Sequence, residues 1–279
     1  MPTAKLAEVD IYFEEHGDGD PLLLVPPSWW PSDTWKVVVV PSLSQRYRTI
    51  IFDPRGTGRS SHPADGYSIS QFAHDSIGLL TYLGISRCHA VGFALGGEIA
   101  QAMAIDRPDL VATLTMAATG PGSRSLQGGR RETGENAERE IQQQGFERFI
   151  RSHVENDITA FGTDFYRNRP DIVAALGQAL WRHQSNPENL RPHHEARRTW
   201  DTLGNAARVQ VSTLILVGGD DVVDRGRSTP LGTARNLVEL VPGAELAVVP
   251  GVKHMVFWDG TGALSMLLDF LSQHPLEKK

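Results

Sequence analysis

Residues 91–100 read Val-Gly-Phe-Ala-Leu-Gly-Gly-Glu-Ile-Ala and continue a short apolar run. Gly92, Gly96 and Gly97 surround the point where this run changes into a segment of small and apolar residues. Glycine allows backbone segments to approach so closely that a Cβ atom would not fit between them. The stretch therefore predicts a buried strand, a sharp turn centred on Ala94 and a helix. It matches the nucleophile-elbow pattern G-x-S-x-G, except that Ala94 stands where the pattern has serine.

Short apolar runs that predict further buried strands recur on both sides of this turn. Together with the run before the turn, they cover residues 22–25, 49–52, 88–91, 111–117, 213–217 and 246–249. Continuous apolar runs are typical of parallel strands that are covered on both faces. Apolar residues at helical spacing over 69–83 and 264–271 predict helices that alternate with these strands. We therefore expect an α/β fold with a doubly wound, mostly parallel sheet.

One long segment, residues 123–210, contains no run that predicts a strand. Its apolar spacing predicts helices near 141–154, 172–180 and 190–203. We expect this segment to form a helical cap, inserted into a core that comprises residues 1–122 and 211–279.

The composition limits the class of protein. The chain has 279 residues, a net charge of −6 and a single cysteine, Cys88. A chain of this length can bury roughly three quarters of its unfolded surface, so a large apolar core is expected. The negative charge provides no basic surface for nucleic acid, and one cysteine provides neither an internal disulfide nor a CxxC site. We expect a globular protein of the cytoplasm, with no secretory signal and no membrane-spanning segment.

Three further motifs accompany the elbow. Residues 53–60 read D-P-R-G-T-G-R-S, residues 214–223 read L-I-L-V-G-G-D-D-V-V, and residues 249–254 read V-P-G-V-K-H. In this order, and over nearly the whole chain, the motifs resemble those of the α/β-hydrolase family. Within the family, the sequence is most similar to 3-oxoadipate enol-lactonases and to small esterases and amidohydrolases.

The resemblance implies a catalytic triad in the family's chain order of nucleophile, acid and histidine. It places the nucleophile at position 94, which Ala94 occupies, and the general base at His254. Asp220 and Asp221 compete for the role of the acid. The family's spacing after Gly218 favours Asp221, and Asp220 is then expected to cap the loop.

An oxyanion hole requires two backbone N–H groups that point to the developing negative charge. The resemblance implies that Leu95 supplies one of them. The other is expected from the loop after the run 22–25. Prolines 26 and 27 have no N–H group, so Ser28 is favoured and Trp29 is the second choice.

Four aromatic residues are candidates for contact with the substrate: Trp29, Trp30, Phe93 and Trp181. Trp29 and Trp30 are equally compatible with a place in the roof of the core. The resemblance to enol-lactonases favours a carboxylic ester or a lactone as the substrate, followed by an amide. Cleavage of a C–C bond is a further alternative. Phe93 weakens it, because C–C hydrolases of this family tend to have Asn before the serine.

Ala94 allows three interpretations. The first is a hydrolase made inactive by replacement of its serine, the second is a natural binding module, and the third is an enzyme in which the His254–Asp221 pair acts alone as a base. We favour the replaced serine, because a binding module has no need for a base that is oriented by an acid.

No cofactor or metal is expected. No G-x-G-x-x-G pattern follows a strand, and the chain has no Gly-Lys pair for a phosphate loop. The cap sequence His193-His194-Glu195 lacks the i, i+4 spacing of histidines in a metal-binding helix. We expect a small-molecule substrate as the partner and leave a homodimer open.

Overall fold

The computed structural model describes residues 2–122, 190–221, 229–259 and 261–276 continuously. Between 123 and 189 it describes residues 139–140, 142–145, 148, 165 and 168–183. The fold is an eight-stranded sheet in the order β1-β2-β4-β3-β5-β6-β7-β8. Its strands are β1 (Thr3–Lys5), β2 (Asp10–His16), β3 (Asp20–Val25), β4 (Tyr47–Phe52), β5 (Cys88–Phe93), β6 (Val111–Ala117), β7 (Ser212–Gly218) and β8 (Glu245–Val249).

The six apolar runs of the sequence form β3 to β8, and these strands pair in parallel. Along β3, Leu22 and Leu24 contribute to one apolar cluster, whereas Leu23 and Val25 contribute to a second cluster. Successive side chains of a strand point to opposite faces, so both faces of the sheet are covered. The predicted α/β fold with a mostly parallel sheet is confirmed.

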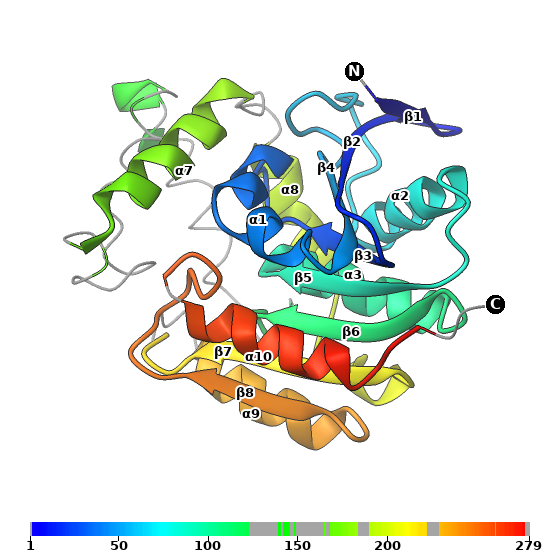
Figure 1. Ribbon diagram of the computed structural model, residues 1–279. Helices are drawn as coiled ribbons and strands as arrows, with labels where there is room; N and C mark the ends of the chain where they lie inside the picture. The colour runs from blue at the N-terminus through cyan, green and yellow to red at the C-terminus, as the bar shows by residue number, and fades with distance from the viewer. Residues whose placement is uncertain are drawn as a thin grey trace.

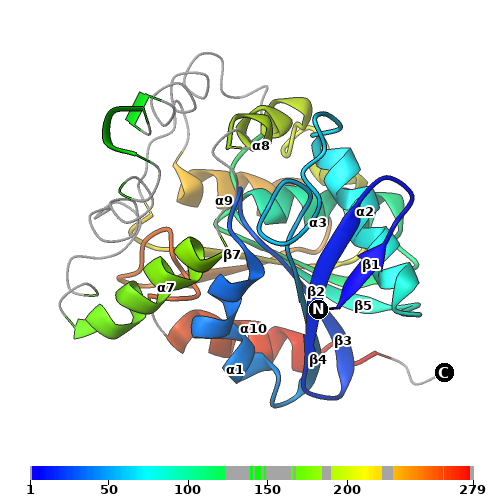
Figure 2. The ribbon, with the colours of Figure 1, turned by 90° about the horizontal axis from the view of Figure 1, so that it is seen from above.

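Helices cover the two faces of the sheet (Figures 1 and 2). One face packs against α2 (Ile69–Tyr82), α3 (Leu95–Asp106) and α9 (Pro230–Leu240). The other packs against η1 (Ser32–Val37), α1 (Val39–Leu43) and α10 (Thr261–Ser272). None of the helices described is long and apolar enough to cross a membrane.

The segment between β6 and β7 adds helices above the sheet. Its described elements are α7 (Pro170–Arg182), α8 (Leu190–Ala196), η3 (Arg197–Thr199) and η4 (Ala206–Arg208). In both views α7 stands apart from the sheet (Figures 1 and 2). The helix expected near 172–180 is confirmed as α7, whereas the single helix expected over 190–203 is wrong, because the backbone becomes extended at Trp200. Most of the helix expected near 141–154 lies outside the described residues. The division into a core and a cap at 123–210 stays a prediction.

Candidate active site

The predicted sharp turn lies between β5 and α3, with Ala94 at its centre. Ala94 has φ 51° and ψ −111°, a backbone conformation that residues with a side chain rarely adopt. A Cβ atom at Gly92 would overlap the carbonyl oxygen of Gly96, and one at Gly96 would overlap that of Val25. The glycines therefore allow the turn to form and to pack directly against the end of β3. This is the strained geometry of a nucleophile elbow.

His254 and Asp221 form a hydrogen-bonded pair in the loops after β8 and β7. His254 Nδ1 lies 2.9 Å from Asp221 Oδ2. Asp221 is fully buried, whereas Asp220 is exposed and its N–H donates to the carbonyl of Val252. The buried carboxylate accepts the Nδ1 proton, so Nε2 of the neutral imidazole is left to accept a proton from another group. The structure thus joins His254 to Asp221 and not to Asp220.

The His254 ring also lies against the elbow. Its centroid is 5.4 Å from that of Phe93, the residue that directly precedes Ala94. The elbow follows β5, and the pair follows β7 and β8. Because the carboxyl ends of parallel strands meet at one edge of the sheet, residues far apart in the sequence come together there.

Two backbone N–H groups at this edge have no acceptor among the described residues. Leu95 is the first residue of α3, and the first N–H groups of a helix have no partner within it. Ser28 lies in the loop after β3, residues 26–30, and its N–H donates to no described residue. The N–H of Trp29, in contrast, donates to Nδ1 of His193 at 3.3 Å. The contact between Gly96 and the end of β3 holds this loop beside the elbow.

Aromatic side chains form one wall beside His254. Phe93 lies 5.1 Å from Trp258 between ring centroids, and Trp258 stacks on Trp35 at 5.0 Å. Trp30 adds an edge contact with Trp258 at 5.8 Å, and Trp29 contacts Trp30 at 6.2 Å. Three of the four expected aromatic residues therefore belong to one aromatic cluster at the site. The fourth, Trp181, lies in α7, and its side chain is outside the described part of the structure.

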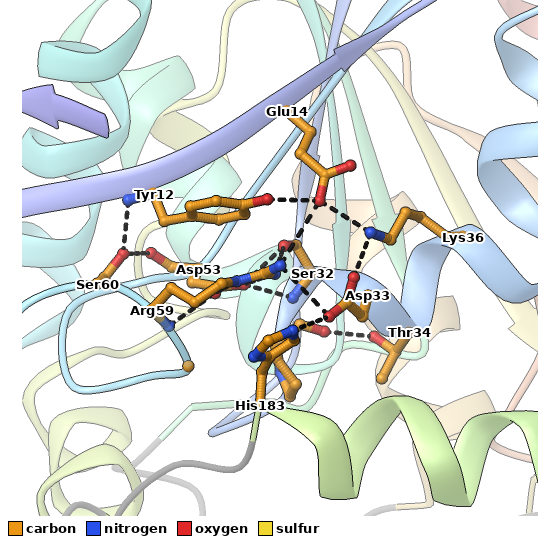
Figure 3. A network of polar contacts seen from close by, with 12 residues as sticks. Tyr12, Glu14, Ser32, Asp33, Thr34, Lys36, Asp53, Arg59, Ser60 and His183 are labelled. Carbon is orange, nitrogen blue, oxygen red and sulfur yellow. Dashed lines mark hydrogen bonds and ion pairs between the residues drawn. The ribbon is translucent and has the colours of Figure 1, made fainter. Parts of the chain in front are cut away.

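A buried network fixes the loop 26–30 where it enters η1 (Figure 3). Asp53, at the end of β4, accepts hydrogen bonds from Ser32 N–H at 2.7 Å and from Ser32 Oγ at 2.6 Å. Arg59 donates from Nε to the second carboxylate oxygen of Asp53 at 2.8 Å. Charge-assisted hydrogen bonds of this kind are among the stronger ones in proteins. The D-P-R-G-T-G-R-S motif thus contributes to the site by holding a neighbouring loop.

The C-terminal end of α7 reaches the same network (Figure 3). His183 Nε2 lies 3.4 Å from Oδ2 of Asp33, and Asp33 pairs with Lys36 and Arg59. Burial and the nearby Arg59 guanidinium lower the pKa of His183, although the Asp33 carboxylate acts in the opposite direction. The contact ties α7 to η1.

His193 is the buried residue whose role the sequence does not indicate. It is fully buried in α8, and Nε2 lies 2.9 Å from the carbonyl oxygen of Arg55. In the sequence, His193 stands out only as part of His193-His194-Glu195, whose spacing does not fit a metal-binding helix. The polar partners of His193 are Trp29, Arg55 and Thr57, which lie 164, 138 and 136 positions away along the chain. Such contacts leave no local signal.

The burial of His193 leads to a prediction about stability. Burial lowers the pKa of His193 from 6.5 to about 4, so between these values the unfolded chain binds a proton that the folded protein excludes. The free energy of unfolding is expected to be highest above pH 6.5. His193 alone should lower it by up to about 3 kcal/mol as the pH falls to about 4.

Urea unfolding followed by tryptophan fluorescence between pH 7 and pH 4 measures this fall. The variant His193→Asn is the control and should show a shallower slope. His89, whose pKa burial also lowers to about 4, contributes equally to both proteins. Equal slopes for the two proteins would contradict the prediction.

The fold is that of a hydrolase scaffold, and comparison with known proteins shows the family. The chain belongs to the alpha/beta hydrolase fold family, whose model matches residues 26–261. A protein of Synechocystis sp. named "Putative non-heme chloroperoxidase" is 28% identical over 277 residues, which are 95% of this chain and 96% of the relative. A protein of Azorhizobium caulinodans named "Putative carbamate hydrolase RutD" is 25% identical, over 91% of each chain.

Among solved structures, the enol-lactonase from Burkholderia xenovorans LB400 matches with a TM-score of 0.83 and 21% identity. The match covers 97% of this chain and all of that chain. At this identity the match supports the fold. The resemblance to the α/β-hydrolase family is confirmed.

Proposed function

We propose that this site belongs to a serine-type hydrolase of carboxylic esters or lactones, with Ala94 in the place of the nucleophilic serine. The observation that carries the proposal is the 2.9 Å hydrogen bond between His254 and the buried Asp221, beside a strained elbow. An acid that orients a histidine next to such a turn serves to remove a proton from a nucleophile. The N–H groups of Leu95 and Ser28, for which the described part of the chain offers no acceptor, support the same assignment.

With serine at position 94, the reaction has two halves. The Ser Oγ attacks the carbonyl carbon while His254 Nε2 takes its proton, and Asp221 stabilises the resulting imidazolium. The N–H groups of Leu95 and Ser28 hold the oxyanion. His254 returns the proton to the leaving alkoxide, and an acyl-enzyme remains; the alcohol departs from an ester and stays attached to the acyl group when a lactone ring opens. Water then attacks the acyl-enzyme while His254 takes its proton. His254 passes this proton to Ser Oγ as the acyl–Oγ bond breaks, and the carboxylic acid is released.

With alanine at this position, the first half of the reaction lacks its nucleophile. We therefore infer that the chain is the inactive form of such a hydrolase, in which a serine has been replaced. A natural binding module is an alternative, as is an enzyme that uses His254 and Asp221 as a base without a nucleophile. An enzyme that uses the pair as a base accounts for the hydrogen bond between His254 and Asp221, whereas a binding module does not.

Amide and C–C bond cleavage are the alternatives for the substrate class. The similarity to a protein named as a carbamate hydrolase favours an acyl–nitrogen bond as the second candidate. The test is an assay of the variant Ala94→Ser on aryl esters, lactones, small amides and vinylogous diketones. Turnover of esters or lactones would support the proposal. Turnover confined to amides or to diketones would replace it with the corresponding alternative.

The assignment of Ser28 leads to a separate prediction. In the Ala94→Ser protein, Ser28→Pro removes the backbone N–H, and kcat is expected to fall by about 10²- to 10³-fold. Ser28→Ala is the matched control, because it keeps the N–H and removes only the hydroxyl. Its kcat should stay within a few-fold. Circular dichroism checks that both variants fold, and an equal loss in the two would contradict the role of the N–H.

A further inference from the structure

The helix α8 places one buried side chain, His193, against the loop 26–30. We propose that His193 is a positioning residue: it holds the Trp29 N–H, so that Ser28 supplies the N–H of this loop to the reacting carbonyl. This inference rests on the proposed function, because it concerns the geometry of the same oxyanion site.

The two ring nitrogens of His193 have different partners. Nδ1 accepts the N–H of Trp29 at 3.3 Å. Nε2 lies 2.9 Å from the carbonyl oxygen of Arg55, which can only accept a hydrogen bond. The proton of the neutral ring therefore sits on Nε2, and Nδ1 is left with the lone pair that Trp29 requires. This arrangement fixes the tautomer of the ring.

Packing fixes the ring as well. His193 is fully buried, and its ring centroid lies 4.9 Å from that of Phe72 and 5.6 Å from that of Tyr67. Trp29 has φ 55°, a left-handed conformation that costs free energy in a residue with a side chain. Such a conformation persists when its surroundings hold it in place, and the hydrogen bond that the Trp29 N–H donates to His193 is one of the contacts that do so.

The consequence concerns which N–H groups of the loop remain available. Pro26 and Pro27 have none, and the N–H of Trp29 is directed to His193. Ser28 has the N–H that no described residue accepts, and it follows β3, whose last residue, Val25, pairs with Gly92 of β5. Rotation of the Trp29 peptide group would move Ser28, because the two residues are consecutive. A displaced Ser28 N–H would donate a weaker hydrogen bond to the oxyanion, so the transition state would be less stabilised.

The segment that contains α8 has other anchors on the core, and the two described next do not involve the loop 26–30. Arg197 pairs with the buried Glu98 of α3 at 2.7 Å. Trp200 donates from Nε1 to Gln101 of α3 at 2.8 Å. Loss of the Trp200 hydrogen bond should loosen the attachment of this segment without altering the partner of Trp29. The variant Trp200→Phe is therefore a matched control.

The experiment compares three variants of the Ala94→Ser protein. In His193→Asn, the side-chain oxygen can take the place of Nδ1 as the acceptor for Trp29. In His193→Gln, the side-chain nitrogen can take the place of Nε2 as the donor to Arg55, and the acceptor for Trp29 is lost. We expect His193→Gln to lower kcat by about 10- to 100-fold with little change in KM. His193→Asn and Trp200→Phe should keep kcat within about threefold.

Equal losses of kcat in His193→Asn and His193→Gln would overturn the proposal, as would a loss of the same size in Trp200→Phe. A loss that appears in KM alone would also overturn it, because the role concerns the transition state.

A second measurement does not depend on catalysis. In the protein with Ala94, nuclear magnetic resonance of the His193 ring should show a protonated Nε2 and an unprotonated Nδ1 at neutral pH. Hydrogen exchange of the Trp29 amide should be at least tenfold faster in His193→Gln than in His193→Asn. A protonated Nδ1, or equal exchange rates, would overturn the proposal even if Ala94→Ser has no activity. Absence of activity in Ala94→Ser would count against the proposed function alone.

Discussion

The substitution Ala94→Ser is expected to raise kcat for an activated aryl ester by about 10⁵- to 10⁶-fold. Removal of the nucleophile from a catalytic triad usually lowers kcat by about this factor, so its addition is expected to raise kcat by a similar factor. The other groups that the proposed mechanism uses are the hydrogen-bonded pair of His254 and Asp221, the strained turn, and the N–H groups of Leu95 and Ser28. Because position 94 already has the elbow conformation, the added hydroxyl requires no rearrangement of the backbone.

Hydrolysis of p-nitrophenyl esters, followed by absorbance, measures this gain. The double variant Ala94→Ser/His254→Ala is the control, because it has the hydroxyl but lacks the base. It should return close to the rate of the protein with Ala94. If Ala94→Ser leaves both ester and lactone hydrolysis at that rate, the proposal of a hydrolase without its nucleophile is wrong.

The second large effect is expected at the acid. In the Ala94→Ser protein, Asp221→Asn should lower kcat by about 10⁴-fold. An amide at this position can donate a hydrogen bond to Nδ1, which would place the proton of His254 on Nε2. The histidine could then no longer accept the proton of the serine. The fold should be retained, because Asn has nearly the same shape as Asp.

The neighbouring Asp220 provides the matched control. It is exposed, it has the same chemistry, and its backbone N–H donates to the carbonyl of Val252, whereas His254 is hydrogen-bonded to the carboxylate of Asp221. Asp220→Asn is expected to change kcat by less than threefold. The reverse ranking of the two variants would show that the acid has been assigned to the wrong residue.

Six of the eight strands could be predicted from the sequence, and the two N-terminal strands could not. The parallel strands β3 to β8 contain runs of apolar residues, because helices cover both of their faces. In contrast, β1 has three residues, and β2 reads Asp-Ile-Tyr-Phe-Glu-Glu-His and pairs in the antiparallel direction. The polar end of β2 resembles a loop when the sequence is read without its partner strand.

Some residues of the candidate site could be predicted from the sequence, and others could not. Position 94, Asp221 and His254 follow apolar runs at spacings that are typical of the family, so the sequence indicates them. His193 could not be assigned in this way. Its three polar partners are Trp29, Thr57 and Arg55, which all lie more than 130 positions earlier in the chain.

The sequence by itself determined the six parallel strands, the helices over 69–82 and 264–271 between and after them, the sharp turn at Ala94 and the family. These properties depend on local features: the period of apolar residues, and the glycines that a tight turn requires. Only the tertiary structure decided that Asp221 and not Asp220 contacts His254, and that His193 accepts the N–H of Trp29. The physical reason is that a hydrogen bond depends on the distance and direction between two groups. For groups on different loops, these are set by the packing of the whole sheet.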